Sequence, residues 1–125
     1  MFKTLTEMLL RRAEANPDAL FVRFVRQGNV VGAYTYSQTW TWVTQWAWTL
    51  IGRGVRRGDR VVLALPNSDD FVGAYLGALL RGGIPAPIAP FRDIVAANPY
   101  VSLVYQRIRL LDAKVLVVPE EQVKI

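Results

Sequence analysis

Hydrophobic residues recur at helical spacing over the first fifteen positions of the chain. The apolar positions that share one face there are Leu5, Met8, Leu9 and Ala13. Thr4 or Thr6 can cap this helix, and the Asn16–Pro17 step ends it near Ala15, because the residue before a proline avoids helical geometry. Two strand-like runs follow at residues 19–25 and 30–36. Because Gly28-Asn29 lies between them, the pattern predicts a β-hairpin.

The aromatic segment after the hairpin fits two periodicities. Alternation of period two, which favours a strand, places six aromatic residues on one side: Tyr34, Tyr36, Trp40, Trp42, Trp46 and Trp48. Helical spacing relates Trp40, Val43, Ala47, Leu50 and Ile51. Ser37 is placed to cap a helix, and Gly52 or Gly54 can end it. We therefore expect a helix from Gln38 to about Arg53, with Trp48 near its exposed face.

Strands and helices alternate through the second half of the chain. Strands are expected at residues 60–65, 84–88 and 114–118, and helices at 68–80 and 101–111. The unbroken apolar run of the first strand suits a strand covered on both faces, whereas Pro85 and Pro87 make the second irregular or an edge strand. This order predicts an α/β fold: a small three-layer parallel or mixed sheet with crossover helices, plus the N-terminal β-hairpin. We treat residues 1–125 as a single partial domain.

Composition excludes several kinds of chemistry. The chain has neither cysteine nor histidine, so it offers no disulfide, no thiolate or imidazole metal ligand and no histidine base. Hydrophobic residues make up 52% and charged residues 20%, as in a globular domain. No apolar run is long enough to span a bilayer, and the N-terminus lacks the features of a secretory signal, so the expected location is cytoplasmic. The net charge of +5 comes mostly from scattered arginines.

Several phrases of the sequence resemble the N-terminal region of adenylate-forming enzymes, a superfamily that includes acyl-CoA synthetases, fatty acyl-AMP ligases and peptide-synthetase adenylation domains. The clearest is Gly54-Val55-Arg56-Arg57-Gly58-Asp59-Arg60-Val61, followed by Leu65-Pro66-Asn67-Ser68 and by Tyr75-Leu76-Gly77-Ala78-Leu79-Leu80-Arg81-Gly82-Gly83-Ile84-Pro85-Ala86-Pro87. Tyr34-Thr35-Tyr36-Ser37 and Asp112-Ala113-Lys114-Val115-Leu116-Val117-Val118 match flanking phrases in the same order. Residues 87–90 and the helix after them look more like the fatty acyl branch than like amino-acid adenylation domains.

The resemblance implies a fragment of the large N-terminal domain of an ATP-dependent acid–thiol ligase. The intact enzyme would use ATP, Mg²⁺ and in some relatives CoA to make an acyl-AMP and pass the acyl group to a thiol. Residues 1–125 contain neither the Ser/Thr/Gly-rich phosphate loop nor the late lysine of the family. We therefore expect no catalytic residue, no metal site and no bound cofactor in this chain, which should be inactive alone. One cofactor-binding segment is predicted, Ala89-Pro90-Phe91-Arg92, because the matching loop of CoA-forming relatives runs close to the CoA nucleotide.

A second hypothesis is a free-standing module that binds protein or nucleic acid. The four tryptophans between Trp40 and Trp48 could stack bases beside the arginines at positions 53, 56, 57 and 60. The more economical interpretation is a core-facing helix whose Trp42 and Trp48 meet another part of the intact enzyme. On that interpretation no nucleic acid is expected, and the partners are the remainder of the enzyme and, through exposed apolar surface, further copies of the chain. The Asp69-Asp70 pair is assigned to a helix start, where acidic residues complement the helix dipole.

Overall fold

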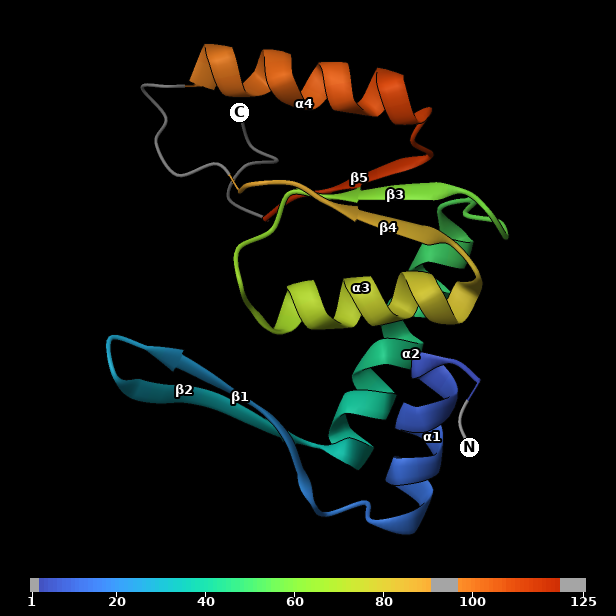
Figure 1. Cartoon of the computed structure of the whole chain (residues 1–125), viewed down its shortest axis with the longest axis vertical. Coiled ribbons are helices and arrows are strands. Elements are labelled where there is room, and N and C mark those ends of the chain that lie inside the picture. Colours follow the sequence, from blue (N-terminus) through green and yellow to red (C-terminus); the bar gives the residue numbers. More distant parts are fainter. Residues whose placement is uncertain (1–2, 91–96, 120–125) are drawn as a thin grey trace.

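The computed structural model describes residues 3–90 and 97–119 (Figure 1). Its elements, in chain order, are α1 (Leu5–Ala15), β1 (Leu20–Arg26), β2 (Asn29–Thr35), α2 (Tyr36–Gly52), β3 (Arg60–Leu63), α3 (Asp69–Arg81), β4 (Ile84–Pro87), α4 (Ala97–Leu111) and β5 (Val115–Val117). The antiparallel hairpin β1–β2 is separate from a parallel sheet of order β4-β3-β5. The predicted fold class is confirmed, and β4 is an edge strand as its prolines indicate.

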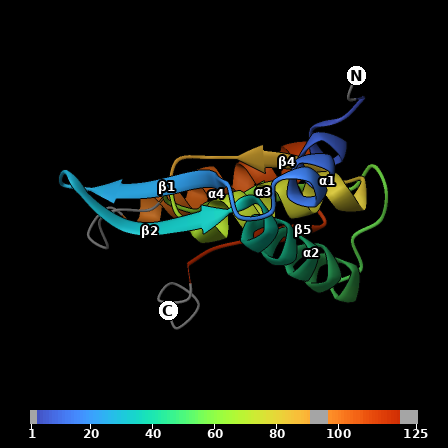
Figure 2. The ribbon, with the colours of Figure 1, turned by 90° about the horizontal axis from the view of Figure 1, so that it is seen from below.

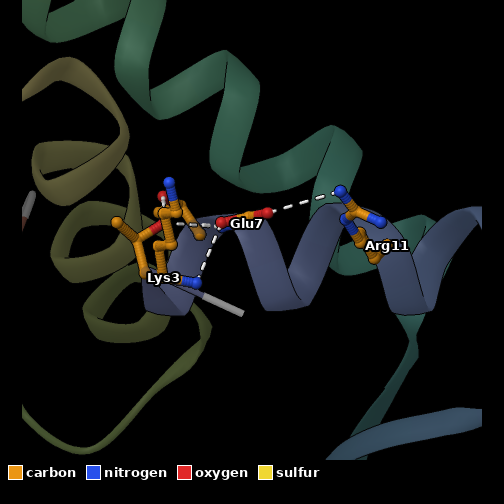
Figure 3. A network of polar contacts seen from close by, with 5 residues as sticks. Lys3, Glu7 and Arg11 are labelled. Carbon is orange, nitrogen blue, oxygen red and sulfur yellow. Dashed lines mark hydrogen bonds and ion pairs between the residues drawn. The ribbon is translucent and has the colours of Figure 1, made fainter. Parts of the chain in front are cut away.

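The first helix begins at a polar network (Figure 3). Thr4 is the N-cap, and its hydroxyl accepts a hydrogen bond of 3.0 Å from the backbone N–H of Glu7. The Glu7 carboxylate in turn accepts the backbone N–H of Lys3 at 2.9 Å and lies 3.5 Å from the guanidinium of Arg11. This is a capping box displaced by one residue, because the glutamate bonds to the residue before the N-cap.

Two predicted boundaries are wrong at α2 and α4. Helix α2 is capped by Thr35, not by Ser37, and the Thr35 and Gln38 side chains form a reciprocal capping box. Helix α4 begins at Ala97, four residues before its predicted start, so Pro99 lies in the first turn and not in the preceding loop. A proline is tolerated there because a first-turn N–H has no partner within the helix. The hairpin turn is also shifted by one residue, since Gln27 and Gly28 carry the positive φ angles of 52° and 81°.

The core lies where α2 and α3 pack together and where α3 meets the sheet. Val61, Val62 and Leu63 of β3 are fully buried, as predicted for a strand covered on both faces. In Figure 1, α3 and α4 lie on opposite sides of the sheet, and α2 and α1 lie beyond α3. One apolar cluster joins Leu50 and Val55 to β3 and α3, and a second joins Leu9 of α1 to Val43 and Leu76. Helix α2 contributes to both clusters and so connects the layers.

Glycines on α3 permit the close approach of α2. A methyl group added at Gly77 would lie 2.7 Å from Cβ of Trp46 and 3.1 Å from the backbone N of Ala47. A methyl group at Gly73 would overlap the indole rings of Trp42 and Trp46. The two glycines therefore allow the backbones of α2 and α3 to approach closely. Gly82, with a φ of 88°, is the left-handed C-cap of α3.

We predict that Gly77→Ala destabilises the chain by about 2 kcal/mol, because an added methyl group in a tightly packed contact forces the helices apart. Gly52→Ala is the matched control, since its methyl group would meet nothing within 4 Å at the end of α2. That variant should be as stable as the original or more stable, by up to about 1 kcal/mol, because alanine favours helix over glycine. Urea unfolding of the two variants measures the difference, and equal midpoints would contradict the packing argument.

Candidate functional site

The carboxyl ends of the parallel strands form the edge at which open α/β sheets usually place ligands. Strand β3 continues past Leu63 into the buried residues Ala64 and Leu65, and the N–H of Ala64 donates to the Val117 carbonyl at 2.9 Å. The N–H of Ile88, just after β4, donates to the Leu63 carbonyl at 2.9 Å. The segments after β3 and β4 are therefore held side by side at this edge.

The predicted cofactor-binding segment begins at this edge. Ala89 and Pro90 follow Ile88 directly, so the structure places them at the carboxyl end of β4, where the sequence predicted them. Phe91 and Arg92 lie outside the described residues. The assignment of these four residues to cofactor binding stays a prediction.

A groove of about 420 Å³ lies between the hairpin and the start of α3. The hairpin contributes Arg23, Phe24 and Tyr34 to it, and the loop before α3 contributes Asn67 and Ser68. In Figure 1 the hairpin extends alongside the loop from β3 to α3. We call this the hairpin groove. Its lining combines guanidinium, hydroxyl and amide groups with apolar side chains, a combination suited to an amphipathic ligand or chain segment.

Asp69, the first residue of α3, is the polar centre of the groove wall. Its carboxylate accepts the Tyr34 hydroxyl at 2.8 Å and the backbone N–H of Asp70 at 2.8 Å. Its backbone carbonyl accepts the indole N–H of Trp42 at 2.8 Å. Ser68 caps the same helix, and its hydroxyl accepts the N–H of Phe71 at 3.3 Å. The predicted helix-start role of Asp69 is confirmed, and sequence reasoning missed that it also fastens the hairpin and α2 to α3.

These contacts set the protonation of two groups. The hydrogen bond to Asp69, together with burial and the charges of Asp69 and Asp70, raises the pKa of Tyr34 to about 12. Burial and the charge of Asp69 raise the pKa of Asp70. A phenol held in its protonated form is a hydrogen-bond donor and not a base, so the role of Tyr34 is to position neighbouring groups. In residues 3–90 and 97–119, no three acidic side chains gather to hold a metal ion.

The tryptophans are divided between the core and the surface. Trp40 and Trp46 pack against the two apolar clusters, and Trp42 contacts Trp46 edge to face at 6.2 Å. Trp42 therefore packs against Trp46 within this chain but stays partly exposed, and the expectation that it also meets another part of the enzyme stays a prediction. Trp48 is 71% exposed, as predicted.

Comparisons with known proteins match this arrangement. The sequence model of the family described as AMP-binding enzyme matches residues 9–124. The chain is 33% identical over 87 residues to a probable non-canonical nonribosomal peptide synthetase, CymA, of Salinispora arenicola, covering 70% of this chain and 1% of the relative. It is 40% identical over 58 residues to 4-coumarate–CoA ligase 1 of Petroselinum crispum, covering 46% of this chain and 11% of the relative. The chain thus spans a small part of either relative.

Solved structures agree with the fold. The fatty acid AMP ligase of Legionella pneumophila superposes with a TM-score of 0.87 at 22% identity, over 99% of this chain and 21% of the other. The fatty acyl CoA synthetase of Mycobacterium tuberculosis superposes with a TM-score of 0.71 at 29% identity, over 90% of this chain and 20% of the other. No helix in the described part of the chain has the length and apolar character needed to cross a membrane.

We predict that Tyr34→Phe lowers the free energy of unfolding by about 1 kcal/mol near neutral pH, because it removes a part-buried hydrogen bond to a carboxylate. The folded pKa of about 12 exceeds the ordinary tyrosine pKa of 10.0, so this contribution is full below pH 10 and is lost as the pH rises through 12. The difference between the two proteins should therefore shrink across that interval in chemical denaturation.

Tyr36→Phe is the control for this measurement. The Tyr36 ring packs at 5.1 Å from Phe21, and its hydroxyl forms no hydrogen bond within the described residues. Its removal should change stability little at any pH. A Tyr34→Phe effect that stayed constant up to pH 12 would refute the role of the hydroxyl in holding Asp69.

Proposed function

This chain belongs to the AMP-binding enzyme family, and we propose that it forms the N-terminal structural portion of an ATP-dependent acid–thiol ligase and is inactive alone. The observation that carries the proposal is the family match over residues 9–124. The matched residues include a parallel sheet whose carboxyl edge lies beside the hairpin groove. In the intact enzyme, ATP and Mg²⁺ would serve carboxylate activation, and CoA or a carrier thiol would accept the acyl group. The chain's own contribution is a scaffold that holds Ala89 and Pro90, the first residues of the predicted cofactor-binding segment, at that edge.

The chemistry of the side chains supports a scaffold. Acyl activation needs groups that hold the ATP phosphates, and this chain has no Ser/Thr/Gly-rich phosphate loop. The acidic pair Asp69 and Asp70 starts a helix, and the Asp69 carboxylate is occupied by Tyr34 and the N–H of Asp70. Phosphate contacts and the catalytic lysine must then come from other parts of the enzyme.

We place the carboxylic acid in the fatty acyl class. Residues 87–90 favour that branch, and structural neighbours above 25% identity include a protein named as a fatty acyl CoA synthetase. An aromatic acid is the second candidate substrate, because other relatives are named as 4-coumarate–CoA ligases.

Isothermal titration tests whether the chain holds nucleotide by itself. We expect no specific heat of binding when ATP or a non-hydrolysable acyl-AMP analogue is added to the chain. The intact fatty acyl CoA synthetase of M. tuberculosis, titrated under the same conditions, is the positive control. Micromolar affinity of the chain alone would refute the scaffold assignment.

The coding sequence downstream of the Ile125 codon provides an independent check. A Ser/Thr/Gly-rich phosphate loop followed by a late lysine would support the ligase. A stop codon at that point would favour the free-standing binding module.

We also propose that the isolated chain self-associates through the tip of its hairpin. Val25, Val30 and Val31 are each about 60% exposed there, and adjacent exposed apolar side chains on a strand favour association. Light scattering at increasing concentration should show a mass above that of a monomer. The triple Val→Thr variant, which keeps the side-chain shape, should reduce it, and a concentration-independent monomer would contradict the proposal.

A further inference from the structure

Positive charge gathers at the amino end of the parallel sheet, opposite the edge described above. Five exposed cations contribute, from the end of α2, the turn after it, the first residue of β3 and the residue before β5: Arg53, Arg56, Arg57, Arg60 and Lys114. The amino ends of parallel strands share one edge, and in Figures 1 and 2 the turn between α2 and β3 lies at the same end of the molecule as the close of α3. We call these five residues the basic end.

Contacts between segments hold the basic end together. The N–H of Lys114 donates to the Arg60 carbonyl at 2.9 Å. The Lys114 side chain passes over the turn after α2, since a methyl group added at Gly54 would lie 3.3 Å from its Cε. Arg57 packs in the same way over Gly82, where an added methyl group would lie 3.2 Å from its Cγ.

The five charges have little internal compensation. None of them forms an ion pair within the described residues. Asp59, half-buried in the turn, uses its carboxylate to accept the backbone N–H of Arg56 at 2.7 Å, and the other nearby acid, Asp112, is exposed. Uncompensated like charges at one place repel one another, so the basic end carries a concentrated positive potential.

Helix dipoles explain only part of this charge. Arg53 is the C-cap residue of α2, where a cation complements the negative end of a helix. Arg81 and Arg109, in the last turns of α3 and α4, have the same explanation, and Arg81 also donates to the Val55 carbonyl at 2.9 Å. Arg56, Arg57, Arg60 and Lys114 lie outside the helices and have no such role.

Aliphatic side chains are exposed beside these cations. Ile84, 48% exposed, is the register partner of Arg60 on β4. Leu110, 76% exposed, lies one tight turn before Lys114, and Ile51, 38% exposed, lies two residues before Arg53. Trp48, 71% exposed, precedes Ile51 by three residues on α2, so the two share a helix face. Three of these four side chains are aliphatic and offer nucleic acid nothing to stack on, whereas all four suit the boundary between lipid headgroups and acyl chains.

We propose that the basic end docks the protein on an anionic phospholipid bilayer as a peripheral contact. The cations would meet lipid phosphates while Ile84, Leu110 and Ile51 enter the boundary of the hydrocarbon layer. The carboxyl edge of the sheet would then face away from the bilayer. This contact needs neither nucleotide nor carboxylate, so it stands apart from the proposed ligase function.

Flotation of the chain with lipid vesicles tests the proposal. The chain should float with vesicles of phosphatidylglycerol mixed with phosphatidylcholine, remain behind with phosphatidylcholine alone, and be released by salt. Arg56→Gln combined with Arg57→Gln should weaken partitioning about thirtyfold, because each cation near an anionic surface contributes about 1 kcal/mol. Leu110→Gln should weaken it further without changing the salt dependence.

The control removes the same charge elsewhere. Arg11→Gln combined with Arg12→Gln, near the end of α1, should leave partitioning close to that of the original chain. An equal loss in the two double variants would overturn the proposal, since the binding would then follow net charge alone. Equal flotation with neutral vesicles would overturn it as well, and so would retention by single-stranded DNA or a polyglutamate resin without flotation. Circular dichroism checks that each variant remains folded.

Discussion

The contact between α2 and α3 is the constraint on which the rest of the structure depends. Gly73 and Gly77 leave room for the Trp42 and Trp46 side chains and for the α2 backbone itself. This close approach lets one helix contribute Val43 to the cluster around α1 and Leu50 to the cluster around the sheet. It also brings the Trp42 indole within hydrogen-bond distance of the Asp69 carbonyl. A larger residue at either glycine would separate the helices and loosen the groove wall along with the core.

The start of α3 joins the hairpin and α2 to α3 at one residue, Asp69. Asp69 has three separate acceptor positions, and they meet the Tyr34 hydroxyl, the Trp42 indole and the N–H of Asp70. The hairpin shares no strand with the parallel sheet. The bond between Tyr34 and Asp69 therefore positions it against the loop after β3. A single aspartate at a helix start therefore stabilises its own helix and fixes the width of the hairpin groove.

The sequence predicted those parts of the fold that depend on local pattern. The order of elements, the parallel pairing and the burial of residues 61–63 follow from period, prolines and glycines, which act over a few residues. Prediction failed where two nearby residues compete for the same role, as Thr35 and Ser37 do for the cap of α2. It also missed the Tyr34–Asp69 bond, because the partners are 35 positions apart and a helix-start aspartate has a sufficient local explanation.

The two ends of the parallel sheet differ in the charge that their residues carry. At the carboxyl end, Ala64, Leu65 and the prolines at 66, 87 and 90 provide backbone and shape with little charge, so that polar groups from elsewhere must supply any chemistry. At the amino end, the turn geometry needs Gly54, Gly58, Asp59 and Gly82 but no cation, yet arginines occupy positions 56, 57 and 60 around them. A turn that needs no cations but holds several of them has charge beyond what folding demands. That excess points outward to a binding partner, because solvation alone would be served equally well by charges of mixed sign.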